Sequence, residues 1–171
     1  MPAKKASPVE RIQESFTKLK EASSFLNTVS DELGYSIANL DAALKKLNLG
    51  ITSWVRVRGA QDENSGYYWH HDLGYAKFSG KWGLAIRTVS GEYGPPEEEV
   101  DQWPFNEAPR SLRIEAVEKI PDLLERLVSD VNDTSAKIIE KSAEVDVYTD
   151  AIKTMNESIV AEAQNEVEAP K

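Results

Sequence analysis

Two neighbouring histidines, His70 and His71, followed by Asp72, come closest to a catalytic or metal-binding group in this sequence. Imidazole and carboxylate side chains can exchange protons near neutral pH, and both can ligate zinc. In an extended strand, however, adjacent side chains point to opposite faces, so these two imidazoles would not reach one metal ion. We therefore predict no catalytic residue, no metal site and no cofactor site here, and we expect the three residues to form a turn at the rim of a sheet.

The rest of the sequence offers no stronger catalytic pattern. No phosphate-binding loop, no GxSxG and no HExxH occurs, and the many carboxylates form no recognisable acid–base pair. The chain has no cysteine, which excludes disulfide and thiolate chemistry and fits a cytoplasmic protein. It also has no apolar run long enough to cross a membrane, and its first residues lack the apolar core of a signal peptide. We predict a cytoplasmic, non-enzymatic protein.

Aromatic and basic residues gather in the middle of the chain. Ten of the fourteen aromatic residues, including all four tryptophans, lie between residues 51 and 105. Trp, Tyr and Arg carry most of the binding energy in protein interfaces. We predict that a surface for a protein partner is formed here by Trp54, Arg56, Arg58, Tyr67, Tyr68, Trp69 and Trp103. The alternative is that these large side chains simply build the core of a small sheet.

The negative charge is concentrated at the other end of the chain. Residues 121–171 carry five basic and twelve acidic residues, which gives this segment a net charge of −7 out of −9 for the whole chain. Phosphates would meet carboxylates there, so we do not expect nucleic acid as a partner. The same charge suggests an alternative function, an acidic inhibitor or decoy of phage or plasmid type that mimics nucleic acid.

Two stretches repeat an apolar residue at alternating steps of three and four. This repeat is typical of long helices that lie against other helices at a shallow angle. The positions in the first stretch, ten of twelve apolar, are Val9, Ile12, Phe16, Leu19, Ser23, Leu26, Ser30, Leu33, Ile37, Leu40, Leu44 and Leu47. Those in the second, eleven of thirteen apolar, are Val117, Ile120, Leu124, Leu127, Val131, Thr134, Ile138, Lys141, Val145, Tyr148, Ile152, Met155 and Ile159.

Between the two stretches the apolar period changes to two, which is typical of strands. In residues 51–58, Val55 and Val57 should face one side, and Trp54, Arg56 and Arg58 the other. Ser79-Gly80 is a two-residue hairpin turn, and pairing Phe78 with Lys81 sets the register. In that register Leu73 faces Ile86, Tyr75 faces Leu84 and Lys77 faces Trp82. On the opposite side Gly74 meets Ala85 and Ala76 meets Gly83, leaving an almost bare face on which a helix could dock.

The sequence therefore predicts an α+β fold, with two long heptad-patterned helices flanking a small antiparallel meander of about three strands. The predicted parts are a disordered lead (1–7), a first helical arm (8–49), the sheet (50–90), a Pro-rich acidic linker (91–110), a short helix, a break at Pro121 and a second arm (111–165), and a disordered tail (166–171). Two helical arms with β-hairpins between them resemble the subunit plan of prefoldin-type chaperones. The resemblance concerns topology only, and no residue is carried over from it.

From these observations we predict a non-enzymatic interaction module. Its arms would self-associate as a coiled coil or bundle into a dimer or tetramer, and its sheet would present the aromatic and basic surface to a protein partner. Whether the arms pair within one chain or between chains stays open. An enzyme of unknown class is the last alternative, and convergent buried polar groups around His70 or His71 would favour it.

Overall fold

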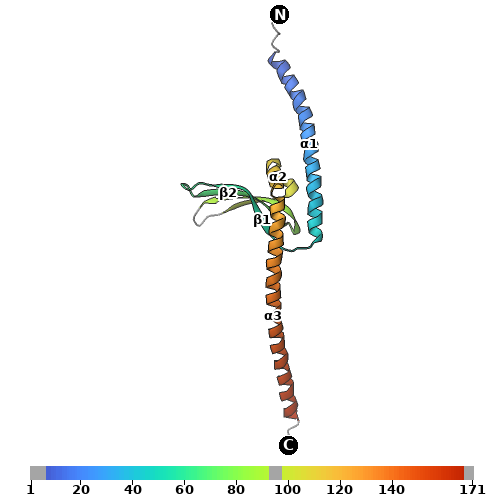
Figure 1. The fold of residues 1–171 in the computed structure, drawn as a ribbon, viewed down its shortest axis with the longest axis vertical. Coiled ribbons are helices and arrows are strands. Elements are labelled where there is room, and N and C mark those ends of the chain that lie inside the picture. The colour runs from blue at the N-terminus through green and yellow to red at the C-terminus, as the bar shows by residue number, and fades with distance from the viewer. Residues whose placement is uncertain (1–6, 93–97, 168–171) are drawn as a thin grey trace. The chain divides into compact units, whose positions relative to one another are not determined.

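The computed structural model describes residues 7–92 and 98–167, and in the last helix it describes side chains as far as residue 159. Over these residues it has an α+β fold, in which three α-helices accompany one antiparallel sheet (Figure 1). The strand order in the sheet is β1-β2-β3-β4. The chain divides into two compact units, Met1–Arg126 and Leu127–Lys171, which we describe separately. The disordered ends predicted from the sequence lie mostly outside the described residues, although Ser7 caps the first helix and residues 166–167 belong to the last one.

Helix α1 (Pro8–Lys46) is a single helix whose ends follow local rules. At its start the Ser7 hydroxyl accepts a hydrogen bond from the Glu10 amide, and the Glu10 carboxylate accepts one from the Ser7 amide, which forms a capping box. Pro8 lies in the first turn, where its missing amide proton costs nothing. Beyond the C-cap residue Leu47, Gly50 takes the left-handed conformation, with φ of 65°.

The sheet follows, with β1 (Ser53–Gln61), β2 (Tyr67–Phe78), β3 (Lys81–Glu92) and β4 (Glu99–Pro104). The predicted register of the central hairpin is confirmed from Phe78–Lys81 through Leu73–Ile86. The prediction of about three strands was wrong, because β4 pairs with β3 from Ala85–Pro104 to Ser90–Glu99. The prediction of a turn at His70, His71 and Asp72 was also wrong, since all three lie inside the twelve-residue strand β2.

A bulge in β1 changes which side chains share a face. Arg56 pairs with Asp72, but the next paired residue, Arg58, lies opposite His71, so the register shifts between them. A bulge adds one residue to one strand and reverses the alternation beyond it. Trp54 and Arg56 therefore share one face of the sheet, whereas Arg58 projects from the other. The prediction that Trp54, Arg56 and Arg58 share a face was wrong for Arg58.

The C-terminal half of α1 docks against the edge of β3. Its side chains Ile37 and Leu44 are buried. The Asp41 carboxylate accepts a hydrogen bond of 2.7 Å from the amide of Leu84, which lies just before the part of β3 that pairs with β4. A side chain thus satisfies an edge amide that would otherwise be open to a foreign strand. Gly83 lies beneath this contact, because a Cβ there would lie 3.0 Å from Asp41 Oδ1.

A short 3-10 helix η1 (Phe105–Glu107) and helix α2 (Arg110–Val117) complete the first unit, together with the first residues of α3 (Ile120–Val167). Phe105 is 2% exposed, Ala116 and Leu123 are fully buried, and all three join the apolar core of the sheet unit. Asn106 donates a hydrogen bond to the Gly34 carbonyl, and Arg113 donates one to the Ser30 hydroxyl, so both segments are fixed to α1. The core of this unit consists mainly of Ile37, Leu44, Leu73, Tyr75, Ala76, Leu84, Ala85, Ile86, Val89, Phe105, Ala108, Ala116 and Leu123.

The apolar repeats of both long helices are largely uncovered in the single chain. In the N-terminal half of α1, Ile12 and Phe16 are each 69% exposed, and Val9, Leu19, Phe25 and Leu26 are exposed as well. In α3, the exposed apolar side chains include Leu124, Val128, Ile138, Ile139, Val145, Val147, Tyr148, Ile152, Met155 and Ile159. Over the described residues, none of the helices contains a stretch apolar enough to cross a bilayer.

Candidate functional site

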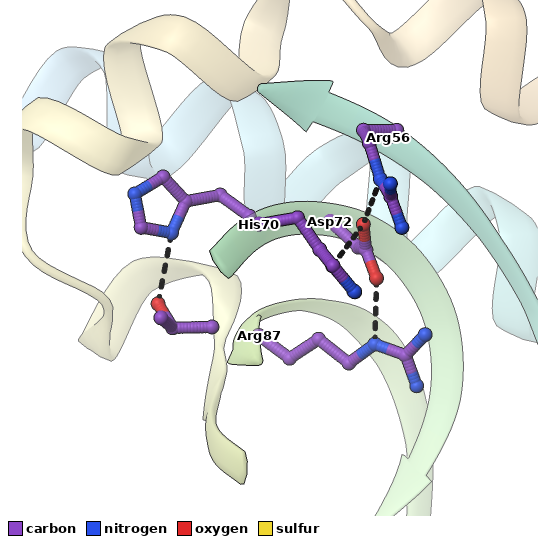
Figure 2. Close-up of polar contacts among 6 residues, drawn as sticks. Arg56, His70, Asp72 and Arg87 are labelled. Carbon is purple, nitrogen blue, oxygen red and sulfur yellow. Dashed lines mark hydrogen bonds and ion pairs between the residues drawn. The ribbon is translucent and has the colours of Figure 1, made fainter. Parts of the chain in front are cut away.

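The most concentrated polar cluster in the sheet is built around Asp72, whose side chain is almost completely buried in β2. One carboxylate oxygen, Oδ2, accepts a hydrogen bond of 2.9 Å from Arg87 Nε. The other, Oδ1, lies 3.0 Å from His70 Nδ1 and 3.5 Å from Arg56 Nε. Figure 2 shows the carboxylate lying between the two arginines. Both oxygens of the buried acid are therefore engaged by cations or by hydrogen-bond donors.

Strand pairing places these residues together. Asp72 lies in the middle of three strands, opposite Arg56 of β1 and opposite Arg87 of β3. Residues directly opposite each other on one face have Cβ atoms only about 5 Å apart, so opposite charges there attract. His70 precedes Asp72 by two residues in β2 and so lies on the same face. The cluster, which we call the Asp72 cluster, consists of Arg56, His70, Asp72 and Arg87.

An indole ring extends this cluster on the same face. The Arg87 guanidinium carbon lies 4.3 Å from the centroid of the Trp54 ring, a cation–π contact. The indole also lies over Gly74, because a Cβ at that residue would be only 2.2 Å from Trp54 Cε3. A glycine is thus required for the ring to occupy this position. Tyr68 stacks beside His70, with ring centroids 6.4 Å apart, and its hydroxyl lies 2.5 Å from Glu98 Oε1.

The charges in the Asp72 cluster do not cancel. Two guanidinium groups share one carboxylate, so Arg56, Asp72 and Arg87 together carry an excess of positive charge. The Arg56 side chain is 62% exposed, against 29% for Arg87. Guanidinium groups bind carboxylates and phosphates through paired N–H donors. Arg56 is therefore the member that can offer N–H groups to an anionic group outside the chain.

A second aromatic group lies on the opposite face of the sheet. Arg58 lies over the Trp69 ring at 5.3 Å, and Trp69 contacts His71, with ring centroids 4.9 Å apart. His71 Nδ1 lies 3.0 Å from the Thr88 hydroxyl, and Arg58 Nη1 lies 3.3 Å from Glu115 Oε1 of α2. The two adjacent imidazoles therefore point to opposite faces, as strand geometry predicted.

The structure divides the residues predicted from the sequence as the partner surface between these two faces. Trp54, Arg56 and Tyr68 accompany the Asp72 cluster. Arg58 and Trp69 lie on the face toward α2. Strand alternation places Tyr67 on that face too, and it also places Trp103 there, because Trp103 pairs with Ile86. Sequence reasoning missed Asp72 as the shared partner of Arg56 and Arg87. The available signal was the predicted hairpin register, which already set Arg87 opposite Asp72.

The titration of His71 gives a prediction about pH. Burial of the imidazole, reinforced by the nearby Arg58 charge, lowers the pKa of His71 below its ordinary value of 6.5, despite the opposing charge of Glu115. Because the unfolded chain then binds the proton more readily, stability should fall as the pH drops below about 6.5. Urea unfolding at pH 7.5 and at pH 5.5 measures the free energy of unfolding at each pH. Its decrease between the two pH values should be smaller for His71→Gln than for the wild type. An equal loss in both proteins would contradict this.

Comparison with family models, with curated proteins and with solved structures finds no significant match to this chain. Within the described residues, no group of three or more His, Cys, Asp or Glu side chains is placed to hold a metal ion.

Proposed function

We propose that this chain is a non-enzymatic protein-interaction module. It self-associates through its long helices and uses the sheet face around Arg56 to bind a protein partner. A cytoplasmic location is part of the proposal, because a chain without cysteine suits a reducing compartment.

The observation that carries this proposal is the exposure of the heptad residues. In α3, Ile138, Val145, Ile152 and Ile159 recur at intervals of seven, and each is between 56% and 63% exposed. Scattered apolar side chains are normal on a surface, but a continuous apolar row along a helix is typical of a face that another helix covers. The N-terminal half of α1 presents a shorter row, Val9 to Leu26, of the same kind. Both rows support self-association as a coiled coil or bundle.

The Asp72 cluster supports a binding role for the sheet better than a catalytic one. A general base needs a lone pair that faces the substrate, but both oxygens of Asp72 already contact His70, Arg56 or Arg87. A hollow of about 440 Å³ beside α1 is lined by other residues, among them Asp41, Ala76 and Gly83. Arg56, by contrast, is exposed and carries uncompensated charge, as an interface arginine does.

The partner surface is tested by capture from a lysate of the source cells. Arg56 is the suitable residue to change, because Trp54 is packed against Gly74 and its loss would disturb the sheet. The wild-type chain and a Lys77→Gln control, which changes another exposed basic residue of the sheet, should retain the same protein. The amount of this protein retained by Arg56→Gln should be lower by at least about tenfold. Equal retention by all three chains, or no retained protein, would contradict the proposed partner surface.

A further inference from the structure

The exposed row on α3 has the charge pattern of a helix that pairs with itself. We take Ile138, Val145, Ile152 and Ile159 as the a positions of a heptad, so that Tyr148 and Met155 are d positions. The residue before each a position is a g position, and g residues flank the contact between paired helices. From residue 130 onward the g residues are Asp130, Lys137, Glu144, Ala151 and Ser158. Lys137 and Glu144 are thus consecutive g residues of opposite charge.

The other flank of the row is uncharged. The e positions, each following a d position, are Ser135, Ser142, Thr149 and Asn156. Between residues 130 and 159, five of the seven acidic residues lie at b, c or f positions, away from a partner helix; these are Asp133, Glu140, Asp146, Asp150 and Glu157. The net negative charge of the helix is therefore largely kept off the seam, and exposed charges at that distance are screened by salt. Besides Asp130, the charged residues that flank the seam and can set partner choice and direction are Lys137 and Glu144.

These two residues distinguish the possible directions. In a parallel, in-register pair each g residue faces an e residue of the other copy, so Lys137 meets Ser142 and Glu144 meets Thr149. Lys141, at a d position, then faces Lys141 of the other copy. In an antiparallel pair g faces g. One register then sets Lys137 of each copy beside Glu144 of the other, which gives two ion pairs. A shift of one heptad either way brings Glu144 against Glu144 or Lys137 against Lys137.

We infer that α3 binds α3 of a second copy of this chain, antiparallel, in the register that sets Lys137 beside Glu144 of the second copy. This inference rests on the proposed self-association and adds its seam, direction and register. In that register Val131 faces Tyr148 and Thr134 faces Val145 of the other copy. The Lys141 ammonium, which faces Ile138 of the other copy, keeps its counterion at hand, because Lys141 Nζ lies 2.6 Å from Glu144 Oε1 of its own helix.

The row on α1 is a weaker candidate for self-pairing of this kind. With Val9 and Phe16 as a positions, its flanking residues in the exposed half are Gln13, Ser15, Lys20, Ala22 and Asn27. Only Lys20 is charged among these, so two copies of α1 offer no complementary pair. Ser23 also interrupts its apolar row at an a position. Charge complementarity thus selects α3 over α1 as the seam between copies.

Disulfide cross-linking tests direction and register, and the absence of natural cysteines makes every cross-link interpretable. The Val131→Cys and Tyr148→Cys chains are oxidised separately and as a mixture, with Thr154→Cys, which lies off the seam, as control. A disulfide requires Cα atoms within about 7 Å. In the inferred register each single variant places its two cysteines about 25 Å apart, whereas the mixture juxtaposes positions 131 and 148. Only the mixture should yield covalent dimers.

The other outcomes of the cross-linking experiment distinguish between the direction of the pair, its seam and self-association itself. Covalent dimers from each single variant alone would show a parallel pair and overturn the inference, while self-association would stand. A non-covalent dimer that no cysteine combination links would overturn the α3 seam or its register. A chain that stays monomeric before oxidation would overturn the proposed self-association itself, so the two failures are distinguishable.

Charge exchange gives an independent check on the same register. Lys137→Glu and Glu144→Lys should each weaken dimerisation by about fivefold, because each substitution replaces two attractive pairs with two repulsive ones. The double variant restores opposite charges and should return the dimer Kd to within about twofold of the wild type. Glu140→Lys, which changes a c position facing away from the seam, should not weaken dimerisation. A double variant weaker than either single one would contradict the pairing.

Discussion

The Val145→Asp chain should be monomeric at concentrations where the wild type is dimeric, whereas Val147→Asp should dimerise normally. Val145 and Val147 are the same residue type in the same helix, and they are 56% and 66% exposed. They differ in heptad position, because Val145 is an a residue of the α3 row and Val147 lies at a c position. Burying two unpaired carboxylates at the centre of a helical seam costs several kcal/mol, so the dimer Kd should rise at least about 100-fold.

Sedimentation equilibrium of both variants over a concentration series measures this effect. Since both valines are exposed in the single chain, neither substitution should disturb the packed sheet unit, and the intrinsic fluorescence of the tryptophans provides that control. Equal Kd values for Val145→Asp and Val147→Asp would show that the heptad row of α3 is not a seam.

Replacing Asp72 with asparagine should cause the largest loss of folding stability. Asparagine has nearly the same shape but no charge, so Arg87 would keep its place in the sheet without a counterion. Removing one partner of a buried ion pair costs about 3–5 kcal/mol, and the lower end applies here because Arg56 and part of Arg87 can turn to water. We expect the free energy of unfolding to fall by about 3 kcal/mol.

Urea unfolding followed by tryptophan fluorescence measures the loss. Asp101→Asn is the matched control, because Asp101 is an exposed acid of β4 in the same sheet, and its substitution should change stability by less than about 0.5 kcal/mol. A loss for Asp72→Asn no larger than that of the control would show that the Asp72 cluster does not stabilise the sheet.

The central hairpin could be predicted from the sequence because its two-residue turn and its pattern of large and small side chains indicate the same register. Ser79-Gly80 fixes a two-residue loop, and both residues take positive φ in the structure. Once Phe78 faces Lys81, the rest of the register follows, including Leu73 opposite Ile86. Local chemistry and strand geometry determine the result without any tertiary information.

Strand β4 and the bulge in β1 could not be read in this way. Pro95, Pro96 and three successive glutamates, the last of which is the first residue of β4, are typical of a linker. Strand β4 is held by pairing with β3 rather than by its own propensity. Nothing in the run of alternating residues 54–58 marks where one extra residue is inserted. Because the bulge reverses the alternation, Arg58 and Arg56 point to different faces, and the predicted single surface becomes two.

Asp72 illustrates the remaining limit of sequence reasoning. Next to two histidines it suggests metal or proton chemistry, but its function in the sheet depends on cross-strand neighbours contributed by β1 and β3. The exposed rows of α1 and α3, by contrast, follow from the heptad repeat alone. Sequence therefore identified the exposed apolar rows of the two helices more completely than the polar cluster.

The central claim, that the exposed helical rows are covered by a second copy, is tested most directly by the mass of the intact chain in solution. Light scattering coupled to size-exclusion chromatography, over a series of concentrations, should give twice the 19.1 kDa of the single chain, or a higher multiple of it. A mass that stays at 19.1 kDa throughout the series would contradict the account.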